Sequence, residues 1–188
     1  MPKRLTLAHR LDFSYEDGPQ NVESLSVSVG EKKIYLISKE KTATIYSLQL
    51  PELIADDLAT GPADDSNNTL QVAGKVGQLA ELKSTHDDAW WERMFARSLL
   101  LTPTALDFSA DDRMAVVSNY RHVYLFSRTG TEAWAVALAR APKILTSHRL
   151  EQGESVTFSV DAREVIVGSE GVNAPLLTIR PSVAAAKL

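Results

Sequence analysis

Apolar and polar residues follow one plan of short blocks along this chain, and the plan is clearest in residues 104–126. Leu106 and Phe108 alternate with polar residues, which is the two-residue period of a strand with one buried face. A polar turn leads to the apolar run at 114–117, and a second polar break leads to a third strand at 123–126. The pattern predicts an antiparallel meander.

The same order of blocks appears once before this stretch and once after it. Register is kept residue by residue, because Leu25, Leu106 and Val156 occupy corresponding positions. Repeated antiparallel units are typical of a β-propeller, in which each blade is a four-stranded sheet. The corresponding strands are expected at residues 23–29, 34–37 and 45–48 in the first unit, and at 154–160, 165–167 and 176–179 in the third.

The fourth, outer strand of each unit has a weaker pattern. Residues 69–73 supply it in the first unit and 144–150 in the second, whereas the third unit reaches Pro181 with three strands. Residues 5–13 alternate like a strand and share His-Arg-Leu with 144–150. We therefore expect residues 5–13 to be the outer strand of a blade whose other strands are missing.

The predicted fold class is all-β, with about three four-stranded meanders permuted by one strand. One half-propeller domain is expected at residues 1–181, followed by a tail at 182–188. A helix is predicted within it at about 84–100, where Trp91 and Phe95 lie at i and i+4. We expect this tryptophan-rich helix to pack over a blade junction, and the alternative is a lid or a partner-binding surface.

A set of three blades predicts association, because propellers need about 4 to 8 blades to close a ring. Unpaired sheet edges and apolar faces favour binding to another chain. The favoured prediction is a homo-oligomer, in which residues 5–13 of one copy close the last blade of a second copy to form a six-bladed ring. The alternatives are a partner polypeptide that supplies the missing blades, or a chain shortened from a longer one.

Composition narrows the possible partners. The net charge of −4 with scattered basic residues argues against nucleic acid, and no apolar run approaches the ~20 residues that cross a bilayer. The absence of cysteine excludes disulfides and thiolate metal sites. The first ten residues lack the apolar region of a signal peptide, so a cytoplasmic location is expected for the chain as it stands.

Carboxylates at corresponding positions are the main candidates for a binding site. Glu23 and Glu154 both begin an inner strand, and by strand parity each shares a face with an apolar residue. The blades of a propeller surround a central channel. A carboxylate on the inner strand must lie at the mouth of that channel or be paired, because burying it alone costs several kcal/mol. The mouth is therefore predicted to bind a cation or polar ligand, and the alternative is that each glutamate accepts hydrogen bonds from a neighbouring blade. The candidate ligand-binding residues are Asp17, Asn21, Glu23, Lys39, Thr104, Glu154 and Glu170, with Lys39 able to pair with either of the inner-strand glutamates.

Four segments also carry a family resemblance. Residues 15–25, 34–39, 103–112 and 152–171 are similar to the "YPDG…EAL", "LYVVTK", "DxSPDG" and "GEAIAY…SEG" elements of a family of uncharacterised bacterial β-propeller proteins. The resemblance covers the later half of that family's usual length, and Asn21 stands where the family has Asp. It implies a propeller fold and an exported relative, and it carries no activity.

Two functional hypotheses follow. The first is a non-enzymatic propeller that binds a ligand or serves as a scaffold and needs no cofactor. The alternative is a metal-dependent phosphoesterase similar to propeller phytases, with channel carboxylates around a divalent cation such as calcium. The aspartates in residues 52–68 lack the spacing of a calcium-binding loop, no nucleophile motif is present, and the four histidines are dispersed, so no catalytic residue is predicted.

Overall fold

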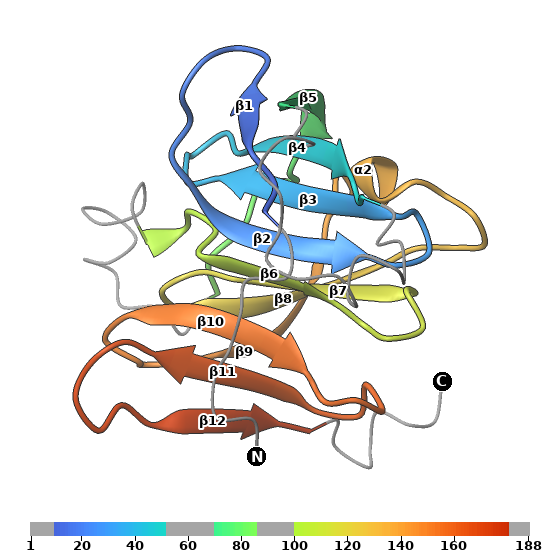
Figure 1. Ribbon diagram of the computed structural model, residues 1–188. Coiled ribbons are helices and arrows are strands. Elements are labelled where there is room, and N and C mark those ends of the chain that lie inside the picture. The colour runs from blue at the N-terminus through green and yellow to red at the C-terminus, as the bar shows by residue number, and fades with distance from the viewer. Residues whose placement is uncertain (1–9, 52–69, 86–99, 181–188) are drawn as a thin grey trace, which may run out of the picture.

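The computed structural model describes residues 10–51, 70–85 and 100–180, and these form an all-β structure with one short helix. The remaining residues, 1–9, 52–69, 86–99 and 181–188, lie outside the described part. The aspartates of residues 52–68, most of the predicted helix and the first part of the predicted strand at 5–13 therefore lie outside it as well. Figure 1 shows the arrangement of the strands.

Three curled sheets follow one another along the chain. The first has the order β1-β5-β4-β3-β2, the second β6-β7-β8-β9, and the third β10-β11-β12. The strands of the first sheet are β1 (Phe13–Tyr15), β2 (Val22–Ser28), β3 (Lys33–Ser38), β4 (Thr44–Gln49) and β5 (Gln71–Gln78). Those of the second are β6 (Ala105–Phe108), β7 (Met114–Ser118), β8 (His122–Ser127) and β9 (Lys143–Ser147), with helix α2 (Trp134–Ala137) between β8 and β9. Those of the third are β10 (Gly153–Phe158), β11 (Val165–Ser169) and β12 (Leu176–Ile179).

The predicted meanders are confirmed in order and pairing. Each unit runs antiparallel from its first to its third strand, and corresponding residues such as Leu106 and Val156 face corresponding partners, Val117 and Val167. The turns between first and second strands also repeat. Asp112 and Ala162 adopt left-handed backbone conformations, with φ of 57° and 55°, at the same point of two of these turns. This conformation is uncommon for residues other than glycine, so its recurrence supports the repeat.

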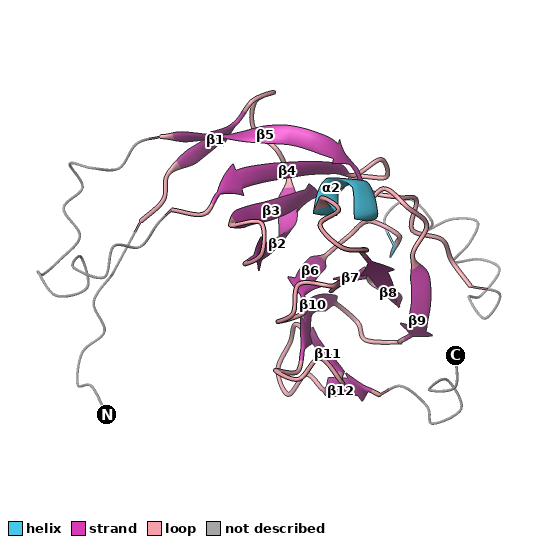
Figure 2. Cartoon of the chain, turned by 90° about the vertical axis from the view of Figure 1, so that its right-hand side faces the viewer, coloured by secondary structure: helices cyan, strands magenta, loops and turns pink. Residues whose placement is uncertain are grey.

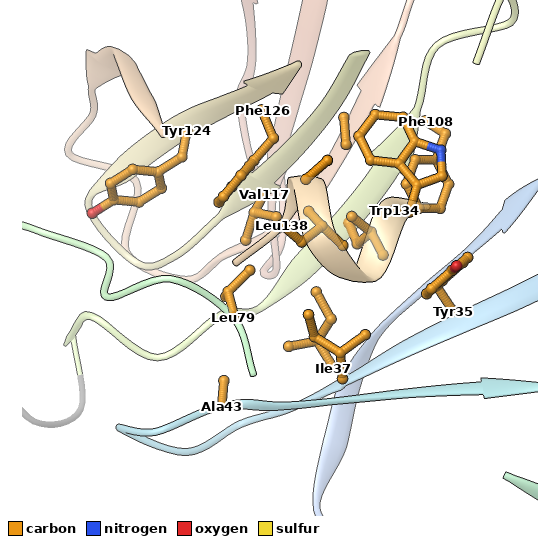
Figure 3. Packing of buried hydrophobic residues seen from close by; sticks show 14 of the residues in the cluster. Tyr35, Ile37, Ala43, Leu79, Phe108, Val117, Tyr124, Phe126, Trp134 and Leu138 are labelled. Atoms are coloured by element: carbon orange, nitrogen blue, oxygen red, sulfur yellow. The ribbon is translucent and has the colours of Figure 1, made fainter. Parts of the chain in front are cut away.

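Consecutive sheets pack face to face. Tyr35, Ile37 and Ile45 of the first sheet pack against Leu106 and Phe126 of the second in the largest buried cluster (Figure 3). A second cluster joins the second sheet to the third. The first strands lie together, because β6 contacts both β2 and β10, while the outer strands are farther apart (Figure 2).

The side chain of Leu25 does not follow the burial of the residues at corresponding positions of the repeat. Its counterparts Leu106 and Val156 are buried, but Leu25 is 55% exposed. The reason is that these residues face the preceding sheet, and among the described residues no sheet precedes the first one. Three buried serines of β2 face the second sheet instead: Ser24, Ser26 and Ser28.

The strand predicted at residues 5–13 is also placed differently where it is described. Residues 10–12 form no strand, and β1 begins at Phe13. β1 runs parallel to β5 in the first sheet, with Phe13 opposite Gln71. Tyr15 packs edge-on against Tyr46 at 4.9 Å, so aromatic packing on the exposed face of the first sheet holds β1 there.

Candidate functional site

A surface concavity of about 480 Å³ lies where the three first strands come together. Four of the seven predicted ligand-binding residues line it, which brings together side chains from all three sheets. The lining residues are Glu23, Thr104, Glu154, Ser155, Ser169 and Glu170.

Two matching irregularities place the glutamates in the concavity. The register between β2 and β3 shifts at Glu23, because Val22 and Ser24 face the consecutive residues Ser38 and Ile37. The register between β10 and β11 shifts in the same way at Glu154. A β-bulge adds one residue to a strand and redirects its side chain. Each glutamate is thus the extra residue of a bulge at the start of an inner strand.

A chain of polar contacts crosses the concavity from the first sheet to the third. Lys39, which follows β3, bonds Glu23 Oε2 with its Nζ at 2.5 Å. The same Nζ donates to the Tyr120 hydroxyl at 2.6 Å and lies 4.9 Å from the centre of that ring. The Tyr120 hydroxyl donates in turn to Glu154 Oε1 at 2.9 Å. One tyrosine of the second sheet thus links an ammonium of the first sheet to a carboxylate of the third.

The electrostatics of the site follow from these contacts. Burial alone would lower the pKa of Lys39, but hydrogen bonds with Glu23 and Tyr120 outweigh it and raise the pKa. Burial raises the pKa of Tyr120, and its bond to Glu154 adds to the rise while Lys39 opposes it. A hydrogen bond with Glu154 and the charge of that residue raise the pKa of Glu170. Lys39 therefore stays charged, while Glu154 and Glu170 repel each other.

The concavity favours a cationic or hydrogen-bonding ligand. Three glutamates and one lysine give its rim a formal charge of −2, counted from Glu23, Glu154, Glu170 and Lys39. Among residues 10–51, 70–85 and 100–180, no group of three or more His, Asp or Glu side chains is arranged to hold a metal ion.

Thr104 donates its hydroxyl to the Gly153 carbonyl at 2.8 Å, so it also joins the second sheet to the third.

Asp17 and Asn21 do not line the concavity. Asp17 accepts a hydrogen bond from the Tyr46 hydroxyl at 3.1 Å and lies 3.6 Å from the Lys75 ammonium, on a different part of the first sheet. Asn21 contributes its backbone, because its carbonyl accepts from the Lys39 amide at 2.8 Å. Asn21 therefore positions Lys39 through the main chain.

Sequence reasoning missed Tyr120 and Asp107. Tyr120 lies in a polar break between strands, where a tyrosine gives no periodic signal. Asp107 lies on β6 at the position that Ser26 and Thr157 hold in the neighbouring first strands. It accepts from the Ser26 hydroxyl at 3.2 Å, the Thr157 hydroxyl at 3.0 Å and the Phe158 amide at 2.8 Å. Its departure from the hydroxyl residues at corresponding positions was a usable signal.

Two of the four histidines, His122 and His148, belong to the described residues, and both are buried. Burial lowers the pKa of His148, which disfavours its charged form. Neither lines the concavity.

Replacing Glu170 by glutamine is expected to stabilise the chain slightly at pH 7. The pKa of Glu170 is raised in the folded state, so the folded state binds a proton more readily than the unfolded state does. Stability is thus present at low pH and falls as the pH rises through this pKa, and the glutamine removes that loss. Thermal unfolding from pH 3 to 8 should show a gain near neutrality that disappears below the ordinary pKa of a glutamate, about 4.3. The exposed Glu151, changed to glutamine, is the control, and an equal gain at all pH values would contradict the assignment.

The comparisons with known proteins give similarities in structure, and the similarity to one solved neighbour is weak. No family model matches the chain, and no curated protein is similar to it in sequence. The structure of a nidogen/laminin complex includes a chain with a TM-score of 0.45 and 9% sequence identity. The alignment covers 85% of this chain and 44% of that chain, so this chain spans less than half the length of the chain in the nidogen/laminin complex. Within the described residues, no helix is long and apolar enough to cross a membrane.

Proposed function

We propose that this chain is a non-enzymatic binding and scaffold module of the β-propeller type, which completes its ring with a second copy of itself. In this proposal, the three sheets are consecutive blades, β2, β6 and β10 are their inner strands, and the concavity lies at the mouth of the channel. The resembling bacterial family supports the same fold.

The observation that carries the proposal is the arrangement of the three first strands. β6 contacts β2 on one side and β10 on the other, and Asp107 bonds to side chains of both neighbours. In a propeller, blades are placed radially with their first strands around the axis. Packing between consecutive sheets is face to face, as blades require.

Self-association follows from the two ends of the stack. The first sheet presents Leu25, 55% exposed, on its outer face, and the third presents Leu176, 73% exposed. Three blades are fewer than the roughly 4 needed for a closed ring. Two copies related by a twofold axis would join the first sheet of each to the third sheet of the other, and this closes the assembly.

The binding role is assigned to the acidic concavity. Its ligand would be a small cation or a polar molecule that offers hydrogen-bond donors to Glu154 and Glu170. We favour binding over metal-dependent hydrolysis because Glu23 and Glu154 are already bonded to Lys39 and Tyr120.

Replacing Leu25 by lysine is expected to weaken self-association by at least about tenfold, since burying an unpaired ammonium at an interface costs more than the ~1.4 kcal/mol that this factor represents. Sedimentation velocity over a range of concentrations measures the change in dissociation constant. Val160 is 95% exposed in the turn after β10, outside the strands, and its change to lysine is the matched control. Equal dissociation constants for the two variants would contradict the proposed interface.

A further inference from the structure

The outer edge of the third sheet lacks the strand that the second sheet has in the same place. Among the described residues, β12 pairs with β11 alone, whereas β8 pairs with β7 and with β9. Leu176 and Thr178 are exposed on β12. An unpaired strand edge offers a row of backbone donors and acceptors to another strand.

In the second sheet, the corresponding edge is paired with β9. The chain contains another segment whose sequence is similar to that of β9. β9 spans Lys143–Ser147 and is followed directly by His148-Arg149-Leu150. Residues 4–8, Arg-Leu-Thr-Leu-Ala, precede His9-Arg10-Leu11 in the same way. The alignment places Leu5 on Ile144 and Leu7 on Thr146, so both segments begin with a basic residue followed by apolar and β-branched ones.

This segment cannot reach the third sheet of its own chain. Leu11 packs on the outer face of the first sheet, at the far end of the stack from β12, as the positions of β1 and β12 show in Figure 2. Residue 8 is three positions before Leu11 in the sequence, and an extended chain covers at most about 3.5 Å per position, or about 10 Å in all. Packed sheets are about 10 Å apart, and the third sheet is two sheets away from the first. β12 therefore lies about 20 Å or more from the first sheet, which is beyond the reach of residue 8.

We infer that residues 4–8 of each copy pair with β12 of the other copy and become the fourth strand of its third sheet. The inference rests on the proposed ring and names the segment that closes it. The pairing of β8 with β9 sets the register, because Tyr124 faces Ile144 and Val123 faces Thr146. By the repeat, Leu5 then faces Leu177 of the second copy.

The same register places Leu7 opposite Leu176 of the second copy. Cα atoms of residues that face each other in an antiparallel pair are about 4.5–5.5 Å apart, which suits a disulfide. The chain has no cysteine of its own, so engineered pairs give unambiguous products. The test is the double variant Leu7→Cys with Leu176→Cys, oxidised with glutathione disulfide and analysed by non-reducing electrophoresis and intact mass.

A covalent dimer that dithiothreitol converts to monomer is the expected product, and mixed single variants, Leu7→Cys with Leu176→Cys, should give the same dimer band. The control pairs Leu7→Cys with Val160→Cys and should give little. A disulfide closed within one chain would overturn the exchange between copies. A double variant that remains dimeric by sedimentation without cross-linking would overturn this segment while leaving the proposed ring intact.

Discussion

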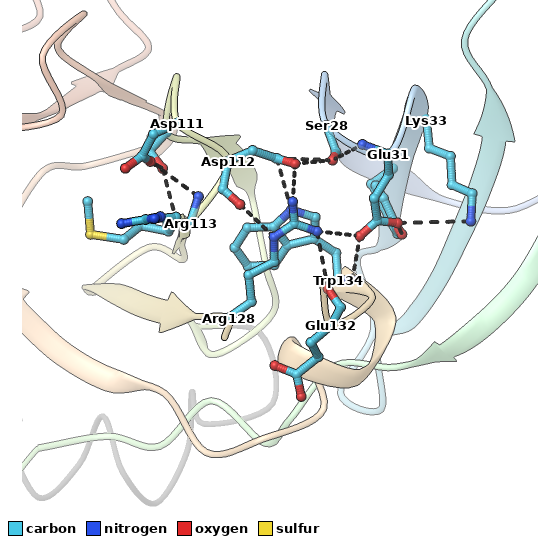
Figure 4. A network of polar contacts seen from close by, with 12 residues as sticks. Ser28, Glu31, Lys33, Asp111, Asp112, Arg113, Arg128, Glu132 and Trp134 are labelled. Atoms are coloured by element: carbon cyan, nitrogen blue, oxygen red, sulfur yellow. Dashed lines mark hydrogen bonds and ion pairs between the residues drawn. The ribbon is translucent and has the colours of Figure 1, made fainter. Parts of the chain in front are cut away.

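Replacing Arg128 by methionine is expected to lower the free energy of unfolding by about 3–5 kcal/mol, because it leaves the buried Asp112 carboxylate without its cation and leaves Glu31 with the more distant Lys33 ammonium, at 3.9 Å. Arg128 contacts Asp112 through Nη2 and Glu31 Oε1 through Nη1, the latter at 2.7 Å (Figure 4). The side chains of Arg128 and Asp112 are each 9% exposed. Glu31 belongs to the first sheet and the other two to the second, so the variant opens the junction between them.

Chemical denaturation measures this loss, and Arg180 supplies the matched control. Arg180 pairs with Glu164 at 2.5 Å, but its side chain is 73% exposed. Exposed pairs contribute about 0–1 kcal/mol, so Arg180→Met should change stability by no more than that. Similar losses in the two variants would show that the buried network does not hold the first two sheets together.

Replacing Trp134 by alanine is expected to cost about 3–5 kcal/mol, the range for removing a buried tryptophan. Trp134 is fully buried in α2, packs 4.7 Å from Phe108 between ring centres, and donates its indole N–H to Asp112 at 3.0 Å. Val136→Ala, on the same helix at 55% exposure, is the control and should cost much less.

The two large effects are not expected to add. The Arg128 guanidinium lies 4.9 Å from the Trp134 ring centre, and both side chains bond to Asp112. Residues that share partners show coupling energies of about 0.5–3 kcal/mol. Urea unfolding of the double variant should therefore give a loss smaller than the sum of the two single losses, and simple additivity would contradict the shared network.

The strand order could be predicted because the repeat is written in local patterns. The alternation around Leu106 and the apolar run at 114–117 specify strands without long-range information, and their recurrence specified the units. The predicted fourth strand at 69–73 was too short, since β5 extends to Gln78. The pairing of β1 (Phe13–Tyr15) with β5 was not predicted, because packing of Tyr15 on Tyr46 is a contact between residues far apart in sequence.

The candidate site was predictable to the extent that it follows the repeat. Corresponding positions brought Glu23, Thr104 and Glu154 together, and Lys39 does pair with Glu23. The bulges were not visible, since a register shift depends on both strands of a pair. Tyr120 was missed for a related reason, because its role comes from contacts with two other sheets.

The solution mass of the wild-type chain tests the central claim most directly. Light scattering coupled to size-exclusion chromatography, at several loading concentrations, gives this mass without a shape assumption. The proposed ring of two three-bladed copies predicts twice 20.6 kDa, with dissociation on dilution set by the Leu25 interface. A well-folded species of 20.6 kDa at every concentration would contradict it.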